Sequence, residues 1–438
     1  MSIDAPSDIA TPGLQRPAAV SGQPLLAIIF LLTLFFSVNI PLGPVVMQPH
    51  RIVLLVLFVP MLLKLISGRP VKPILADWLV LFSALWAGVS LAANHPIGQI
   101  IEPSGIYILE FFGAYLLGRM LILSSADFQR FVKVLYWSLP FMLVLAAVEA
   151  FTRRPIGLNL IGKTIHLNPG DIRFGLKRAQ VTFAHPILYG AYVTSLLGIV
   201  WYALEPSASF VARAARAILI FVTSFFALSS GAMIAFVVQS AFIGWEMITR
   251  RMRRPWTLLA LLFVALYIFI DLFAGGSPFH VLVRYASLNT GSAYNRILIF
   301  EYGSANVMAN PLFGLGERTW ERPNWMVASV DNVWLVIAMK HGFPAILSIG
   351  LAIFLLLRKI SLQRLEDPLD RACRAGYLVT MGGLIIAGGT VHYWQAMLAL
   401  FMFLLGAGGW VLQTPAAGAG QAPAKAATSS RKQKKTVL

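Results

Sequence analysis

The sequence predicts an all-α polytopic membrane protein with about 12 transmembrane helices. Of its 438 residues, 58% are hydrophobic and only 12% are charged, whereas soluble domains are about 45–50% apolar and about 25% charged. The apolar residues gather in runs long enough to cross a bilayer, and the basic residues lie between those runs. We therefore expect a helix bundle that packs through small residues and shape.

The apolar runs supply a candidate for each span. A spanning helix needs about 20 mostly apolar residues, and such runs occur at 24–43, 52–66, 74–93, 106–123, 133–151, 186–204, 216–229, 231–249, 256–274, 333–357, 375–390 and 393–412. A large loop, 275–332, separates the ninth span from the tenth, and a shorter one, 152–185, separates the fifth from the sixth. Residues 1–23 and 413–438 are predicted to be disordered tails, and residues 1–23 lack the features of a cleavable signal peptide.

Basic residues set the predicted orientation, because cytoplasmic loops carry an excess of Lys and Arg. They occur in alternate loops, for example around Lys64, Arg130, Arg251 and Arg358. This alternation places both termini in the cytoplasm and both long loops on the outer side of the membrane. Insertion topology and contact with membrane lipid therefore explain the net charge of +17, and we expect no nucleic-acid partner.

The two outer loops break this charge rule. The first holds six cations and one acid, Asp171, and the second holds four arginines together with four acids. Arginine presents a planar fork that suits phosphate oxygens. The simpler alternative is ion pairing with each loop's own acids, and it fits the second loop better than the first.

Segment 284–342 has features of a site on this outer face. Segment 310–316 reads Asn-Pro-Leu-Phe-Gly-Leu-Gly, a turn in which backbone amides can approach a substrate closely. Asp331 stands just before an apolar run, where it can act as a base or cap the helix; geometry alone favours capping. Glu110 lies within a predicted span, where an ionisable group usually faces a cavity or a partner, and its role stays open between structure and function.

Four motifs in order resemble the O-antigen ligase and O-antigen polymerase superfamily. Asp331-Asn332, nine residues and Gly342 resemble the family's His-Asn, nine residues, Gly signature; 310–316 resembles its turn; and Arg296 precedes that turn by fourteen residues. Arg178, followed by Phe183, His185, Pro186 and Gly190, is similar to the family's Arg-bearing entry into a middle helix. The motifs cover roughly 170–360.

The resemblance implies a GT-C-like fold in a bacterial inner membrane and an inverting, metal-independent glycosyl transfer on its periplasmic face, with no cofactor. The donor would be an undecaprenyl-diphosphate-linked glycan, and a flippase and a chain-length regulator are candidate protein partners. By this analogy Arg178 and Arg296 bind the diphosphate and Asp331 occupies the position of the base. The further substrate-binding candidates, listed together, are Arg284, Arg173, Glu301, Asn332 and His341.

Two departures from the family pattern influence the interpretation. The ligases carry His where this chain has Asp331, and Ser229-Ser230-Gly231 stands where the family often has Ser-Arg-Gly, so that Arg284 is a candidate substitute for the missing Arg. The Asp favours a polymerase of O-antigen or exopolysaccharide repeat units over a ligase that transfers the chain to a lipid acceptor. Outside this family, a transporter or flippase of lipid-linked sugars and a structural subunit of an envelope-assembly complex are the alternatives.

Overall fold

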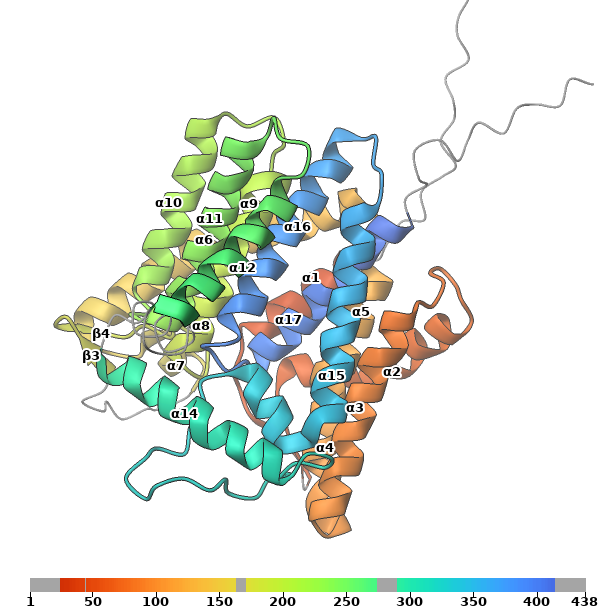
Figure 1. Cartoon of the computed structure of the whole chain (residues 1–438), viewed down its shortest axis with the longest axis vertical. Helices are drawn as coiled ribbons and strands as arrows, with labels where there is room; N and C mark the ends of the chain where they lie inside the picture. The colour runs from red at the N-terminus through yellow and green to blue at the C-terminus, as the bar shows by residue number, and fades with distance from the viewer. Residues whose placement is uncertain (1–23, 44, 163–170, 274–289, 414–438) are drawn as a thin grey trace, which may run out of the picture.

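The computed structural model describes residues 24–43, 45–162, 171–273 and 290–413, and most of them are helical (Figure 1). The longer helices are α1 (Pro24–Leu34), α2 (Pro49–Ile66), α3 (Leu75–Asn94), α4 (Ile97–Ile108), α5 (Ala114–Leu121), α6 (Ser125–Thr152), α8 (Pro186–Thr194), α9 (Leu196–Ala203), α10 (Phe210–Phe225), α11 (Ser230–Thr249), α12 (Pro255–Phe273), α14 (Thr290–Ala309), α15 (Val333–Leu362), α16 (Pro368–Ala387) and α17 (Ala396–Ala407). One π-helical turn, η1 (Leu109–Gly113), joins α4 to α5, and a 3₁₀ turn, η3 (Gly408–Leu412), follows α17. The remaining elements are α7 (Ile156–Leu160) and two antiparallel hairpins, β1 (Ile40–Leu42) with β2 (Val45–Met47) and β3 (Ile172–Arg173) with β4 (Leu176–Lys177).

Helices occupy all twelve predicted span ranges. Within the described residues, eight helical segments are long and apolar enough to cross a membrane: 49–66, 75–94, 97–121, 125–152, 186–203, 230–249, 255–273 and 333–362. The other four predicted ranges hold α1, α10, α16 and α17, which are shorter or more polar. The polytopic all-α prediction is thereby confirmed, and the number of 12 spans stays a prediction.

The first predicted span, 24–43, differs most from the structure. Its helix, α1, ends at Leu34 after 11 residues, a length of about 16 Å at 1.5 Å per residue, which is about half of a bilayer's apolar core. The β1–β2 hairpin follows, and Gly43 adopts a positive φ of 63° there. Pro41 lacks a backbone N–H, and in a helix its ring would clash with the Ser37 carbonyl, so a regular helix cannot continue through this part of the range. The predicted tail 1–23, and the predicted tail 413–438 beyond residue 413, lie outside the described residues.

Close backbone contact joins α5 to α17 in the middle of the bundle. A Cβ added to Gly406 would lie 2.0 Å from the Tyr115 carbonyl oxygen, and one added to Gly118 would lie 2.1 Å from the Phe403 carbonyl oxygen. Only glycine permits this approach, and small residues at helix contacts are how membrane helices pack without a hydrophobic driving force. The packing expected from the glycine-rich sequence is therefore present.

Ion pairs inside the bundle connect helices that are distant in the sequence. Arg119 Nε donates to Asp77 Oδ1 at 2.9 Å, and Arg51 Nε donates to Glu110 Oε1 at 2.7 Å. Breaking one partner of a buried pair costs about 3–5 kcal/mol because an uncompensated charge remains. These pairs fix α3 to α5 and α2 to η1.

The turn at 310–316 docks onto a kink in α15. Gly342 has a φ of 75°, a left-handed conformation inside the helix, and a Cβ there would lie 2.2 Å from the Leu312 carbonyl oxygen. The Leu315 N–H donates to the Met339 carbonyl at 2.7 Å. The sequence suggested that the amides of this turn approach a substrate; instead, the Leu315 amide binds a carbonyl of α15. Two family-like motifs therefore act together as a structural joint.

Both predicted outer loops contain regular structure. Loop 152–185 includes α7 and the β3–β4 hairpin, and loop 275–332 includes the 20-residue helix α14. These elements lie at the same end of the bundle (Figure 1). The fold thus brings together the two segments with the unusual arginine content.

Candidate active site

Hydrogen bonds to two backbone carbonyls hold Arg178 in place. Its backbone N–H donates to the Asp171 carbonyl at 2.8 Å, and its Nε donates to the Ala227 carbonyl at 3.3 Å. The preceding residue, Lys177, forms a buried ion pair with Glu149 of α6. Arg178 is only 7% exposed, so its guanidinium is directed by the protein rather than by solvent.

Arg296 projects from α14 toward the start of α11. Its Nη2 donates to Ser230 Oγ at 3.5 Å, and a Cβ added to Gly231 would lie 3.5 Å from the same nitrogen. The Ser229–Gly231 segment, which lacks the arginine expected from the family pattern, is therefore the place where the Arg296 guanidinium lies. The small side chains there leave room for it.

Asp331 stands one residue before the N-cap of α15. The cap is Asn332, whose Oδ1 accepts from the Leu335 N–H at 3.0 Å. The Val333 N–H donates to the Gly388 carbonyl at 2.9 Å, which fixes this helix start against the segment between α16 and α17. Capping, the role that geometry alone favoured for Asp331, belongs to Asn332.

Asp331 lies near enough to Arg178 and to Arg296 for its charge and theirs to affect each other's pKa. Burial raises the pKa of Asp331 above its usual value, and the positive charges of Arg296 and Arg178 oppose that rise. Burial lowers the pKa of Arg296, and Asp331 opposes that change. Burial and the charge of Arg173 lower the pKa of Arg178 to about 10, which is still well above neutral pH. A guanidinium group stays protonated in proteins, so Arg296 is a cation as well. We call Arg178, Arg296 and Asp331 the arginine–aspartate cluster.

Arg173 and His185 border this cluster. Arg173 Nη1 donates to the Leu228 carbonyl at 2.8 Å, and its charge acts on both cluster arginines. Burial, followed by the charge of Arg178, lowers the pKa of His185 to about 4. His185 Nδ1 accepts from the Ile187 N–H at 3.2 Å, which leaves Nε2 as the protonated nitrogen of a neutral ring. His185 is therefore a hydrogen-bond donor toward its surroundings at neutral pH.

The other predicted substrate-binding residues are distributed around the site. Asn332 is adjacent to Asp331 but uses its side chain as the helix cap. Glu301 is exposed on α14, five residues beyond Arg296. His341 is 3% exposed, farther along α15, in a separate cavity. Arg284 lies outside the described residues.

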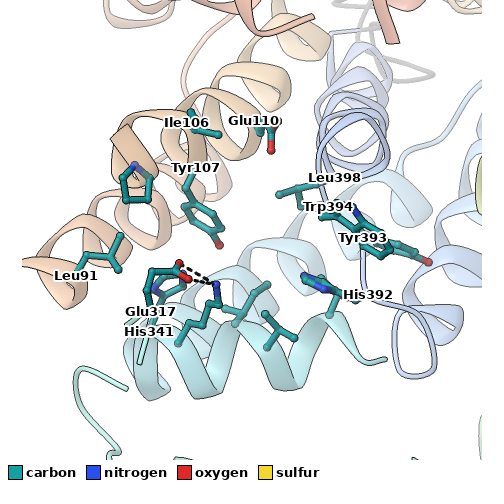
Figure 2. Close-up of a pocket in the computed structure, with 15 residues that line it drawn as sticks. Leu91, Ile106, Tyr107, Glu110, Glu317, His341, His392, Tyr393, Trp394 and Leu398 are labelled. Carbon is teal, nitrogen blue, oxygen red and sulfur yellow. Dashed lines mark hydrogen bonds and ion pairs between the residues drawn. The ribbon is translucent and has the colours of Figure 1, made fainter. Parts of the chain in front are cut away.

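That cavity, which we call the α4–α15 cavity, has a volume of about 360 Å³ (Figure 2). Its polar and aromatic lining includes Tyr107, Glu110, Lys340, His341, His392 and Trp394. Lys340 Nζ donates to Glu317 Oε2 at 2.7 Å along one wall. Figure 2 shows the Tyr107 phenol and the Glu110 carboxylate pointing into the space between the α4–η1 and α15 ribbons. This volume is within the range of small-ligand pockets, about 300–1,000 Å³.

The cavity and the cluster share walls. The His392 and Trp394 rings are 5.4 Å apart, and the Trp394 and His185 rings are 5.7 Å apart. Val333, two residues after Asp331, lines the cavity. The start of α15 and segment 388–394 therefore form a wall of the cavity and also adjoin the cluster.

Sequence reasoning left Glu110 undecided and did not select Tyr107. The signal for Glu110 was an acid inside an apolar run, and the structure explains how it is tolerated, because His50 and Arg51 both contact it. Tyr107 had no distinguishing signal, because one Tyr in a membrane helix is unremarkable. Among the described residues, no group of three or more His, Cys, Asp or Glu side chains is arranged to hold a metal ion.

The family model described as O-antigen ligase matches residues 215–350. The match includes Arg296, the 310–316 turn, Asp331 and Gly342, but not Arg178. A comparison with curated proteins finds no match.

Proposed function

We infer that this chain, with the O-antigen ligase match across residues 215–350, is a membrane enzyme of the O-antigen ligase and polymerase superfamily that transfers glycan from a lipid-linked donor. More specifically, we infer that it joins O-antigen or exopolysaccharide repeat units carried on undecaprenyl diphosphate at the periplasmic face. The arginine–aspartate cluster is the observation that carries this proposal. It joins two cationic forks with one carboxylate at one end of the bundle.

The arginines suit the leaving group. In the proposed reaction the bond between the sugar's anomeric carbon and the diphosphate oxygen breaks, and undecaprenyl diphosphate leaves with the bonding electrons. Arg178 and Arg296 would donate to the phosphate oxygens as negative charge develops on them. Fixed charges in a water-poor site stabilise such a transition state without reorganisation. Two guanidinium groups can supply this stabilisation without a metal ion.

Asp331 suits the role of base. An acceptor hydroxyl attacks the anomeric carbon from the face opposite the diphosphate, and Asp331 receives its proton, so the configuration inverts. The raised pKa of Asp331, caused by burial, makes its carboxylate a better proton acceptor than an exposed Asp. Asn332, not Asp331, caps α15, and this arrangement leaves the Asp331 side chain available for chemistry.

Polymerisation and ligation differ only in the acceptor. A repeat unit still on its carrier is the acceptor in polymerisation, and a different lipid is the acceptor in ligation. The Asp in place of the ligases' His favours polymerisation. The products distinguish the two reactions, because a failed polymerase leaves single units on the carrier and a failed ligase leaves complete chains there.

The test is to size surface and lipid-linked glycans in a deletion strain that expresses Arg296→Ala or Asp331→Ala at wild-type level. Arg154→Ala is the matched control, because Arg154 is exposed in the same outer loop as Arg178. We expect single repeat units to accumulate on the carrier in both variants and normal chains in the control. Normal chains in all three strains would exclude the proposed enzyme and favour a transporter or a structural subunit.

A further inference from the structure

The α4–α15 cavity contains polar groups that the proposed reaction does not use. Glu110 lies on the π-helical turn η1, and its Oε1 accepts from Arg51 Nε at 2.7 Å and contacts His50 Nε2 at 3.1 Å. Both recorded contacts reach the same carboxylate oxygen, so Oε2 is left to accept a further hydrogen bond. Isolated π-turns occur frequently at functional sites, and an acid within a membrane span usually serves a partner or a cavity.

Two further polar atoms have no protein partner. Among the described residues, the Tyr107 hydroxyl and His341 Nδ1 are enclosed and form no hydrogen bond. His341 is 3% exposed, and its ring lies 5.0 Å from that of Tyr107. Leaving enclosed polar groups unsatisfied costs free energy, so their clustering around one cavity points to a ligand with hydroxyl groups or a similar pattern of donors and acceptors.

The charge balance of the cavity indicates the class of ligand. Glu110 is compensated by Arg51, and Lys340 is compensated by Glu317, whose carboxylate lies 2.7 Å away. With its charges balanced in this way, the cavity offers no excess charge of either sign to an ion. Its remaining features are neutral hydrogen-bonding groups and aromatic surfaces, including Trp394. The hydroxyls of a neutral sugar can bind the hydrogen-bonding groups, and the apolar face of its ring can pack on the aromatic surfaces.

We propose that the α4–α15 cavity is a carbohydrate-binding site that holds a phosphate-free sugar residue of the acceptor glycan. Glu110 Oε2 accepts from a sugar hydroxyl, and the Tyr107 hydroxyl and His341 Nδ1 form two further hydrogen bonds. The wall shared with the arginine–aspartate cluster places the acceptor next to the donor's diphosphate. Sugar binding stands on the cavity alone; the acceptor role rests on the proposed function.

The test uses full-length protein in nanodiscs and isothermal titration calorimetry. The probe is the phosphate-free oligosaccharide that mild acid releases from the lipid extract of the glycan-producing cells. Tyr107→Phe removes only an unpartnered hydroxyl, so folding is preserved, and Val336→Phe fills the cavity that Val336 lines. Tyr267→Phe, on the exposed surface of α12, is the matched control.

We expect wild type and Tyr267→Phe to bind the probe equally. Tyr107→Phe should bind it about threefold to tenfold more weakly, the range for loss of one neutral hydrogen bond, and Val336→Phe should not bind it. Absence of binding to wild type, or equal binding to wild type, Tyr107→Phe and Val336→Phe, would overturn the proposal.

One further variant separates this proposal from the proposed function. Arg296→Ala should lose glycan assembly in cells but bind the phosphate-free probe within about twofold of wild type, because the probe lacks the group that Arg296 would hold. Normal glycan assembly in this variant would count against the proposed function and would leave the sugar-binding result to be judged by Tyr107→Phe and Val336→Phe.

Discussion

Replacement of Arg296 tests two proposed effects of its charge, which are stabilisation of the leaving diphosphate and lowering of the Asp331 pKa. In the proposed reaction, Arg296→Ala removes one of two cationic donors to the leaving diphosphate. Removing one preorganised donor from an active site reduces kcat by about 10²–10³-fold, equivalent to about 2.7–4 kcal/mol. Arg296→Lys retains a charge but not the planar fork, so we expect a smaller reduction. The assay is single-turnover extension of a purified lipid-linked repeat unit by protein in proteoliposomes.

The same variant should change the pH dependence in a defined direction. Arg296 lowers the pKa of Asp331 against the larger effect of burial, so removal of Arg296 should raise that pKa further. As the proposed base, Asp331 can accept a proton only when it is ionised, so we expect activity to fall as pH drops through its pKa. The acidic limb of kcat/KM should therefore move to higher pH in Arg296→Ala and less so in Arg296→Lys.

Arg154→Ala is the control for both measurements. It should match wild type in rate and in pH profile, because Arg154 is exposed. A rate for Arg296→Ala within about twofold of wild type would refute the diphosphate role. If the acidic limb of the kcat/KM profile of Arg296→Ala stayed in place or moved to lower pH, the coupling between Arg296 and Asp331 would be refuted.

Three further changes have definite expected outcomes. Asp331→Asn keeps the shape of the side chain but cannot accept the proton, so single-turnover rates should fall about 10²–10⁴-fold, while a fall of less than tenfold would assign the base elsewhere. Lys177→Met leaves Glu149 without its buried partner, so thermal unfolding in detergent should show a free energy of unfolding lower by about 3–5 kcal/mol. The double variant Lys177→Met/Glu149→Leu should largely recover this loss. Equal stability of Lys177→Met and wild type would contradict the expectation. Gly342→Ala places a Cβ 2.2 Å from the Leu312 carbonyl oxygen at a φ of 75° and should lower the melting temperature sharply. Gly350→Ala has open space around its Cβ and should not. Equal melting temperatures would contradict the close packing of the 310–316 turn against α15.

Apolar periodicity predicted the helices well because the bilayer sets their length. Every predicted range contains a helix, and the errors are at ends that local chemistry controls. Pro41 and Gly43 convert the second half of the first range into a hairpin. The helix predicted from residue 106 begins at Ile97 in the structure. The prediction began too late because the first part of α4 contains too many polar residues to count as an apolar run.

The arginine–aspartate cluster was predictable in its members but not in its geometry. Arg178, Arg296 and Asp331 were selected because they follow a family-like pattern, and their proximity depends on tertiary packing of α14, the β3–β4 hairpin and the start of α15. The functions of Asn332 and the 310–316 turn could not be read from the sequence, because a cap and a docked turn use the same residue types as a ligand site. Neither could the α4–α15 cavity, since its lining comes from segments more than 200 residues apart, such as Tyr107 and His392.

The most direct test of the central claim is to measure carrier release in proteoliposomes. Wild-type protein would be given a lipid-linked repeat unit, and free undecaprenyl diphosphate and glycan length would be quantified together, with and without a metal chelator. We predict one carrier released for each unit added to the chain, in the presence of chelator as well, and no release by Asp331→Asn. Donor that crosses the bilayer intact, with no carrier released, would contradict glycosyl transfer and identify the chain as a transporter.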